Sequence, residues 1–206
     1  MPPVTVDPAR VKPFPSAAAF ERWISANHAK ADELWLRIYK KASGVQTVSY
    51  AEALDIALCW GWIDGLKKSF DEASFIQRFT PRRPKSVWSQ VNREHVERLI
   101  REQRMTPHGL KHVDAAKQDG RWDAAYAPIR AASSDGIPDD LRAAIKANAK
   151  AERTFKTLNK MNLFALNYRT TAMRTPAGRA KKIADLVAML ARGETITPLP
   201  KPAKKK

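Results

Sequence analysis

The chain has 206 residues and a formal net charge of +16, from 37 Lys and Arg against 21 Asp and Glu. Hydrophobic residues make up 44% and charged residues 28% of the sequence, which excludes wholesale disorder and is typical of one domain or two small ones. The single cysteine excludes an internal disulfide and a cysteine-based zinc site, and it fits a reducing compartment.

The first residues predict neither an export signal nor a membrane anchor. Residues 1–13 contain four prolines and no apolar segment of the signal-peptide type, so we expect an irregular lead-in. The longest apolar stretch, residues 53–63, is too short to cross a bilayer and contains Asp55. We therefore expect no transmembrane segment and a cytoplasmic location.

Residues 14–84 predict a mixed α and β part. Ser16 is expected to cap a helix, and residues 34–39 alternate in hydrophobicity as a strand does. Ser49 and Glu52 have the spacing of a capping box, which predicts a second helix. That helix is expected to end at a glycine, and a β-hairpin is expected to follow it. The expected stop is Gly61, and the hairpin strands are residues 62–68 and 75–80.

Residues 85–197 predict helices, and residues 198–206 predict a disordered basic tail. The expected helices begin at Ser86 or Ser89, at Thr106-Pro107, at Asp139, at Ala149 and at Thr175-Pro176. The fold class is therefore α+β. A small antiparallel sheet of about three strands is packed by N-terminal helices, and a helical C-terminal half packs on this part to give one compact unit. The pattern gives no oligomeric state.

The segment from Ser49 to Asn92 contains the residues most suited to binding. Three of the six tryptophans (Trp60, Trp62 and Trp88) lie within 29 residues. The cations of this segment precede an expected helix N-terminus, whose free N–H groups and dipole favour an anion. These cations are Arg82, Arg83 and Lys85.

We hypothesise an anion pocket at this turn. Arg82, Arg83 and Lys85 would bind the anion, Trp88 would stack on a ring, and Asn92 would orient the ligand from one turn further along the helix. Trp62 and Asp64 would contribute from the neighbouring strand. The alternative is structural: the prolines and Trp88 fix the turn, and the arginine side chains are solvated.

Other candidate groups have weaker signatures. Asp64 would act as a general acid or base, would pair with Arg82 in a salt bridge, or would form a structural hydrogen bond that closes the turn at Gly65. Cys59 lies between apolar neighbours and is expected in the core. His108 and His112 have the i,i+4 spacing of metal ligands, but the position after His108 is Gly109 rather than the glutamate of zinc proteases. We expect no metal and no cofactor.

The basic charge is concentrated late in the chain, where residues 151–206 hold 13 Lys and Arg against 3 Asp and Glu. Such a distribution is typical of contact with a polyanion, so non-specific nucleic-acid binding is a second hypothesis. A solubilising surface is the alternative explanation.

Several motifs carry a family resemblance over roughly residues 14–198. They are SYAEALDIALCWGWIDG, RFTPRRPKSVWSQVN, Gly120-Arg121-Trp122 and the end of the last helix, ARGET. With them the sequence resembles the YdeI/OmpD-associated family, also called the bacteriocin-protection family. The resemblance implies a link to resistance against bacteriocin or cationic-peptide stress, and it supplies no reaction and no catalytic residues.

The sequence therefore predicts a cytoplasmic, non-catalytic protein of the bacteriocin-protection type that binds a phosphate- or nucleotide-like anion at the Arg82–Asn92 turn. One alternative is a nucleic-acid-binding module that uses the basic C-terminal half. Another is an enzyme that acts on an acidic or phosphorylated small molecule, with Asp64 as acid or base.

Overall fold

The computed structural model describes residues 5–173 and 175–199. The chain divides into two compact units, Met1–Ala125 and Tyr126–Lys206, called unit 1 and unit 2 below. This division differs from the expected boundary at residue 84, because the first two helices after the sheet pack within unit 1. Most of the expected basic tail, residues 200–206, lies outside the described residues.

Unit 1 contains a four-stranded sheet with the order β1-β2-β4-β3. The strands are β1 (Val11–Pro13), β2 (Leu34–Tyr39), β3 (Trp62–Ser69) and β4 (Ser74–Pro81). The antiparallel hairpin of β3 and β4 confirms the sequence prediction, and β2 pairs antiparallel with β4. A register shift between Asp64 and Lys67 interrupts the pairing of β3 with β4.

The fourth strand, β1, was not predicted, and residues 11–13 are a correction to the expected irregular lead-in. They pair in parallel with β2, Val11 opposite Trp35 and Pro13 opposite Arg37. A three-residue strand that includes a proline has no periodicity of its own. It exists because it lies at the sheet edge, where a proline without an N–H is tolerated.

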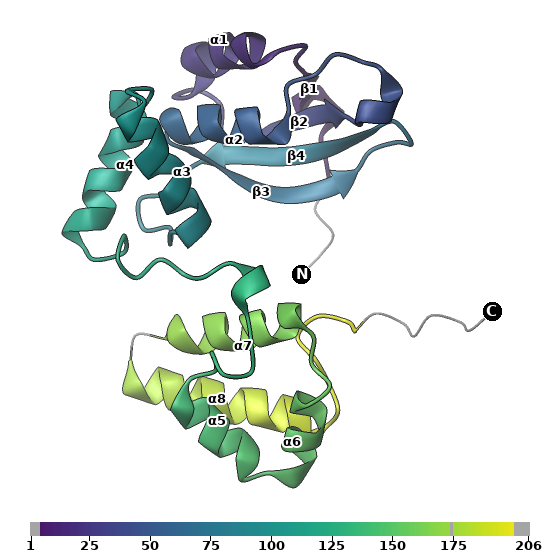
Figure 1. Ribbon diagram of the computed structural model, residues 1–206, viewed down its shortest axis with the longest axis vertical. Coiled ribbons are helices and arrows are strands. Elements are labelled where there is room, and N and C mark those ends of the chain that lie inside the picture. Colours follow the sequence, from purple (N-terminus) through teal and green to yellow (C-terminus); the bar gives the residue numbers. More distant parts are fainter. Residues whose placement is uncertain (1–4, 174, 200–206) are drawn as a thin grey trace. The chain divides into compact units, whose positions relative to one another are not determined.

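Two helices, α1 (Ala17–Asn27) and α2 (Tyr50–Cys59), cover one face of this sheet (Figure 1). The expected caps are present: the Oγ of Ser16 accepts a hydrogen bond from the Ala19 amide. Ser49 and Glu52 form the complete capping box of α2. Trp60 ends α2, and Gly61 follows with a φ of 74°, a left-handed conformation that favours glycine.

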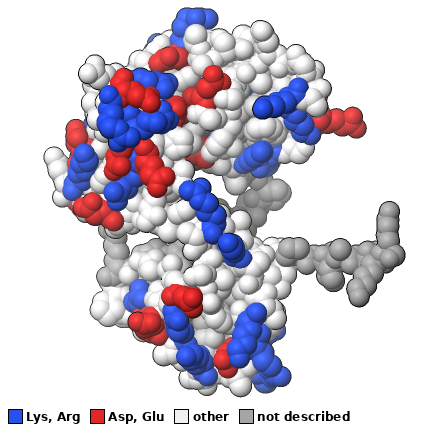
Figure 2. Space-filling model, in the orientation of Figure 1, with Lys and Arg blue, Asp and Glu red and all other residues white. Residues whose placement is uncertain are grey.

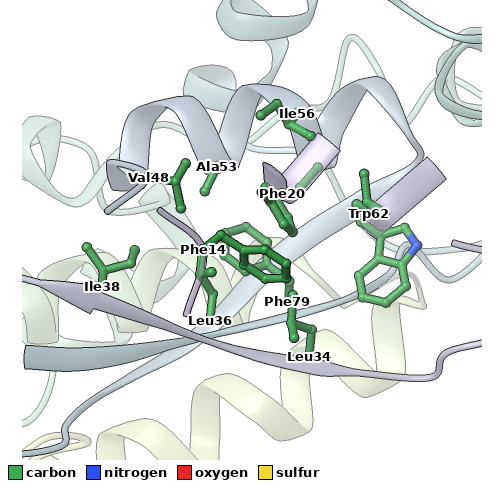
Figure 3. Close-up of a cluster of buried hydrophobic side chains, with 12 residues drawn as sticks. Phe14, Phe20, Leu34, Leu36, Ile38, Val48, Ala53, Ile56, Trp62 and Phe79 are labelled. Carbon is green, nitrogen blue, oxygen red and sulfur yellow. The ribbon is translucent and has the colours of Figure 1, made fainter. Parts of the chain in front are cut away.

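The core of unit 1 lies between α1, α2 and the sheet (Figure 3). Its buried members are Phe14, Phe20, Ile24, Leu34, Leu36, Ile38, Val48, Ala53, Ile56, Ala57, Trp62 and Phe79. The other side of α2 packs in a second cluster with α3 (Gln90–Arg101) and α4 (Pro107–Gln118). Burial on two sides explains why the sequence of α2 is apolar almost all round.

The ends of α3 and α4 follow the expected cap residues. Ser89, rather than Ser86, caps α3 through the Asn92 amide, and Thr106 caps α4 with a proline at its first position. The Oγ1 of Thr106 also donates to the carbonyl oxygen of Cys59 at 2.6 Å, which ties the start of α4 to the end of α2.

Unit 2 is helical. Its helices are α5 (Asp139–Lys146), α6 (Ala149–Phe155), α7 (Lys160–Thr171) and α8 (Pro176–Ala191). Helix α7 was not predicted, because its fully buried positions are Asn162, Leu166 and Thr170, and only one of these is apolar. The described residues thus form a mixed α+β fold with eight α-helices and one four-stranded sheet, and they include no helix long and apolar enough to cross a membrane.

Candidate functional site

The turn between β4 and α3 is built around the side chain of Arg82. This side chain is only 4% exposed, and its guanidinium carbon lies 3.6 Å from the centre of the Trp88 ring. Its Nη1 donates to the Ser86 Oγ at 3.3 Å and to the Val87 carbonyl oxygen at 3.1 Å. Arg82 is therefore part of the turn rather than a solvated cation, and its stacking on Trp88 stabilises the turn.

A second arginine holds the same turn from α4's C-terminal side. Nη1 of Arg121 donates to the Ser86 carbonyl oxygen at 2.8 Å, while its Nε donates to the Asp119 carboxylate at 2.8 Å. The following residue, Trp122, packs edge-on against Trp88 with ring centres 4.9 Å apart. Two arginines and two tryptophans thus preorganise the segment that leads into α3.

Several cations lie near the neighbouring histidine, His112. Burial lowers the pKa of His112, and the positive charges of Arg82, Lys111 and Arg121 lower it further. Arg83 and Lys85 are exposed on the loop and add charge at its rim. The arrangement can hold a phosphate or a carboxylate with charge-assisted hydrogen bonds.

Asn92 lies on the first turn of α3 and is 8% exposed. Its backbone N–H donates to the capping Oγ of Ser89 at 3.1 Å. Asn92, Arg82 and Trp88 are therefore all buried at or near the turn, whereas Arg83 and Lys85 are the residues of this predicted set that solvent reaches freely.

The structure does not bring Trp62 and Asp64 into the same cluster as Trp88. Trp62 belongs to the core between the helices and the sheet, and its Nε1 donates to the His28 carbonyl oxygen at 3.1 Å. Asp64 accepts a hydrogen bond from the hydroxyl of Tyr50 at 2.8 Å. This hydrogen bond joins β3 to the start of α2, and the acid–base role of Asp64 stays a prediction.

Cys59 lies in the core, and His108 lies close to other aromatic rings. Cys59 is buried, and burial raises the pKa of its thiol to about 11, which confirms its place in the core. His108 is exposed and lies near His28 and Trp60, with its ring centre 4.1 Å from that of His28. No group of three or more potential ligands that could hold a metal ion occurs in the described part of the chain.

Sequence reasoning missed three residues of the turn's environment: Lys111, His112 and Arg121. They lie roughly 25 to 40 residues after the turn, and their relation to it depends on how α4 packs. Arg121 could have been found from its place directly before Trp122, because the segment of residues 82–88 also contains an arginine, Arg82, close to a tryptophan, Trp88.

Several arginines elsewhere in unit 1 form ion pairs with acids, among them Arg10, Arg37, Arg78 and Arg98. Figure 2 shows basic and acidic side chains mixed over the part of unit 1 that holds α3 and α4. There, Arg98 bonds the Asp55 carboxylate at 2.6 Å and that of Glu102 at 3.0 Å. The two charges of such a pair offset each other, so Arg98 attracts an external anion only weakly.

Two family models match the chain. Residues 12–112 match a domain of unknown function (DUF8412), and residues 136–193 match the model described as bacteriocin-protection, YdeI or OmpD-associated. Neither the comparison with curated proteins nor that with solved structures gives a match. The second model confirms the resemblance and places it in unit 2, whereas the tryptophan-rich motifs of residues 49–92 lie within the first.

Proposed function

We propose that this chain, whose residues 136–193 belong to the bacteriocin-protection, YdeI or OmpD-associated family, is a cytoplasmic, non-catalytic protein that protects cells against bacteriocin or cationic-peptide stress. In this proposal it binds a phosphate-like anion at the turn of residues 82–92. The family match supports the protective role, and the turn supports the ligand class.

The observation that carries the ligand proposal is the exposure of Arg83 and Lys85 on a turn that Arg82 and Trp88 hold in place. Burial lowers the pKa of His112, and repulsion from the positive charges of Arg82, Lys111 and Arg121 lowers it further, so these cations lie near its imidazole. An anion would relieve this repulsion. Arg83 and Lys85 are placed to make the first contact, because they are exposed.

A ligand at this turn requires the exposed pair, while Arg82 keeps the turn in shape. Replacing Arg82 removes its stacking on Trp88 and two hydrogen bonds, so the fold of the turn would change together with any binding. The informative variant is therefore the double substitution Arg83→Gln and Lys85→Gln. Only the backbone carbonyl of Arg83 is used in the turn, as acceptor from Ser86, and it is retained.

The binding test is calorimetric titration with inorganic phosphate and pyrophosphate at pH 7.5 and pH 6. The wild type is expected to bind, and R83Q/K85Q is expected to bind at least about tenfold more weakly, because two charge-assisted contacts are lost. Binding should be tighter at pH 6, since an anion favours the protonated imidazole of His112. The matched control is Lys30→Gln, an exposed lysine of unit 1 outside this turn.

The protective role is tested in cells that lack the gene. Wild type and Lys30→Gln are expected to restore survival on exposure to a bacteriocin or a cationic peptide, and R83Q/K85Q is expected to restore less. Equal survival with and without the wild-type chain would remove the protective role. Full protection by R83Q/K85Q, with no phosphate binding, would separate protection from the turn.

A further inference from the structure

A second surface of unit 1 combines open aromatic area with positive charge. It is a groove of about 680 Å³ where β2 ends, next to the 3₁₀ turn Lys41–Ser43 and the start of α2. Its lining residues are Pro15, Ser16, Ile38, Tyr39, Lys40, Lys41, Val45, Gln46, Thr47, Ser49, Tyr50 and Phe75. The volume is in the range of small-molecule sites, about 300–1,000 Å³.

The charged residues of this lining are both basic. Lys40 donates to the backbone carbonyl oxygen of Glu72 at 2.8 Å, so its charge is not neutralised by that contact. Lys41 is exposed. The acid at the start of α2, Glu52, is not in the lining and is already bonded by the amide and hydroxyl of Ser49, at 2.8 and 2.7 Å. The groove therefore favours an anion.

The groove also offers an exposed aromatic residue, Tyr50. Phe75 has the ammonium of Lys67 at 4.0 Å over its ring, and Tyr39 has the guanidinium of Arg37 at 4.6 Å. Tyr50 is 39% exposed, and Val45 in the same groove is 49% exposed. An aliphatic side chain beside an exposed ring is a surface on which a planar ligand can stack.

The ring of Tyr50 is held in place from its far end. Its hydroxyl donates to the Asp64 Oδ2 at 2.8 Å, and burial together with the Asp64 carboxylate raises the pKa of Tyr50 above its usual range. The hydroxyl thus stays a hydrogen-bond donor at neutral pH. Because Tyr50 is also the first residue of α2, both its backbone and its ring are fixed, which lowers the entropic cost of binding.

We propose that this groove binds an aromatic phosphate of the size of a mononucleotide, with the ring on Tyr50 and the phosphate at Lys40 and Lys41. A free inorganic anion would use the lysines and leave the apolar surface in water. An uncharged ring would stack on Tyr50 and leave the positive charges of Lys40 and Lys41 without a counter-ion. A ligand that carries both groups is the one that the whole lining fits. The site shares no residue with the 82–92 turn and does not depend on the function proposed for that turn.

The probes are adenosine 5′-monophosphate, adenosine and inorganic phosphate, each titrated into the full chain. Binding is followed by calorimetry and by the backbone amide shifts of residues 39–50. The variants are Lys40→Gln with Lys41→Gln, and Tyr50→Ala with Tyr50→Phe as its matched control. Lys30→Gln controls for loss of charge, and R83Q/K85Q controls for binding at the other turn.

We expect the monophosphate to bind more tightly than either adenosine or phosphate, and to shift amides of residues 39–50. K40Q/K41Q is expected to weaken the monophosphate by about tenfold and to leave adenosine unchanged. Tyr50→Ala is expected to weaken both nucleoside ligands by about tenfold, while Tyr50→Phe keeps most of the affinity because it keeps the ring.

The proposal is overturned if the monophosphate and phosphate bind equally well, or if neither K40Q/K41Q nor Tyr50→Ala changes the affinity. It is also overturned if R83Q/K85Q alone abolishes binding, since the ligand would then occupy the 82–92 turn. Loss of phosphate binding in R83Q/K85Q with intact monophosphate binding in the groove would leave both proposals standing. If Tyr50→Ala does not fold, K40Q/K41Q alone decides between these outcomes.

Discussion

The contact between α2 and α4 allows the effect of one methyl group to be worked out. A Cβ at Gly109 would meet the carbonyl oxygen of Cys59 and would lie 2.7 Å from that of Leu58. Both oxygens belong to the last turn of α2, so neither can move without shifting the helix. The carbonyl oxygen of Cys59 in this turn also accepts a hydrogen bond from the Thr106 hydroxyl at 2.6 Å. Moving α4 away from α2 would break that hydrogen bond.

The expected cost follows from two opposing effects. Gly109 lies in the first turn of α4, where alanine gains at most about 1 kcal/mol from helix propensity. Overpacking a filled contact costs about 1–3 kcal/mol, and two fixed backbone oxygens favour the upper end. The Gly109→Ala variant should therefore lose about 2 kcal/mol of unfolding free energy, which corresponds to a decrease in Tm of about 8 °C for a unit of this size.

The assay is thermal unfolding followed by tryptophan fluorescence, because all six tryptophans lie in residues 1–125 and report on unit 1 alone. The control is Gln118→Ala, an exposed position of the same helix, which should change the stability by less than about 0.5 kcal/mol. A Gly109→Ala protein as stable as the wild type, or more stable, would refute the close packing of α4 on α2.

Three further predictions concern buried polar groups. The free energy of unfolding of unit 1 should fall as the pH decreases below 6.5, because the unfolded chain protonates His112 there and the folded state, with its lowered pKa, does not. Urea unfolding at pH 7.5 and pH 5.5 measures this change in stability, which should be smaller in His112→Gln than in the wild type. An equal change in both proteins would contradict the prediction. Cys59 should react with a thiol reagent at pH 8 far more slowly in the folded chain than in denaturant, since its pKa is about 11; equal rates would show that the site is open. Replacing Asn162 by alanine should lower the unfolding free energy of unit 2 by about 2 kcal/mol and speed hydrogen exchange at the Thr197 amide. The reason is that the Asn162 side chain bonds both the carbonyl and the amide of Thr197, at 3.1 and 2.9 Å. Unchanged exchange would mean that other contacts hold this segment.

The elements that the sequence predicts are those specified by neighbouring residues. The caps Ser16, Ser49, Thr106 and Thr175 each lie within three residues of the amide that they bond, so their helices can be located from short motifs. The β3–β4 hairpin is likewise local. These elements account for most of the fold, and the α+β class follows from them.

The elements that were missed depend on partners far along the chain. Strand β1 is stabilised by pairing with β2, more than 20 residues later. Helix α7 can bury Asn162 and Thr170 because their side chains are hydrogen-bonded. Asn162 donates to the Thr197 carbonyl oxygen, and Thr170 donates to the Leu166 carbonyl oxygen. A hydrophobicity pattern treats both as exposed positions, although hydrogen bonds offset the cost of burying them.

The site was predicted in part for the same reason. Arg82, Trp88 and Asn92 lie near one another in sequence and in the structure, and all three are buried. The sequence could not show that the Arg82 side chain would be buried. Its burial depends on stacking against Trp88, and Trp88 is itself packed against Trp122 from a later segment. The groove next to Tyr50 was not predicted at all, since its lining comes from four separate segments of unit 1.

The number of basic residues along the sequence and the surroundings of those residues in the structure point to different candidate sites for anion binding. The sequence places most of the excess positive charge after residue 150, yet within the described residues of that region Arg179 is bonded to Asp140 at 2.6 Å and Arg192 to Glu194 at 2.8 Å. An arginine in such a pair has little attraction left for an external anion, because a competing ligand must first break the pair. Repulsion between neighbouring cations is the opposite condition, since a bound anion then lowers the energy of several groups at once. In unit 1, Arg82, Lys111 and Arg121 lie near His112, and Arg83 and Lys85 are exposed on the same turn, which is why we propose the ligand at this turn rather than in the more basic half of the chain.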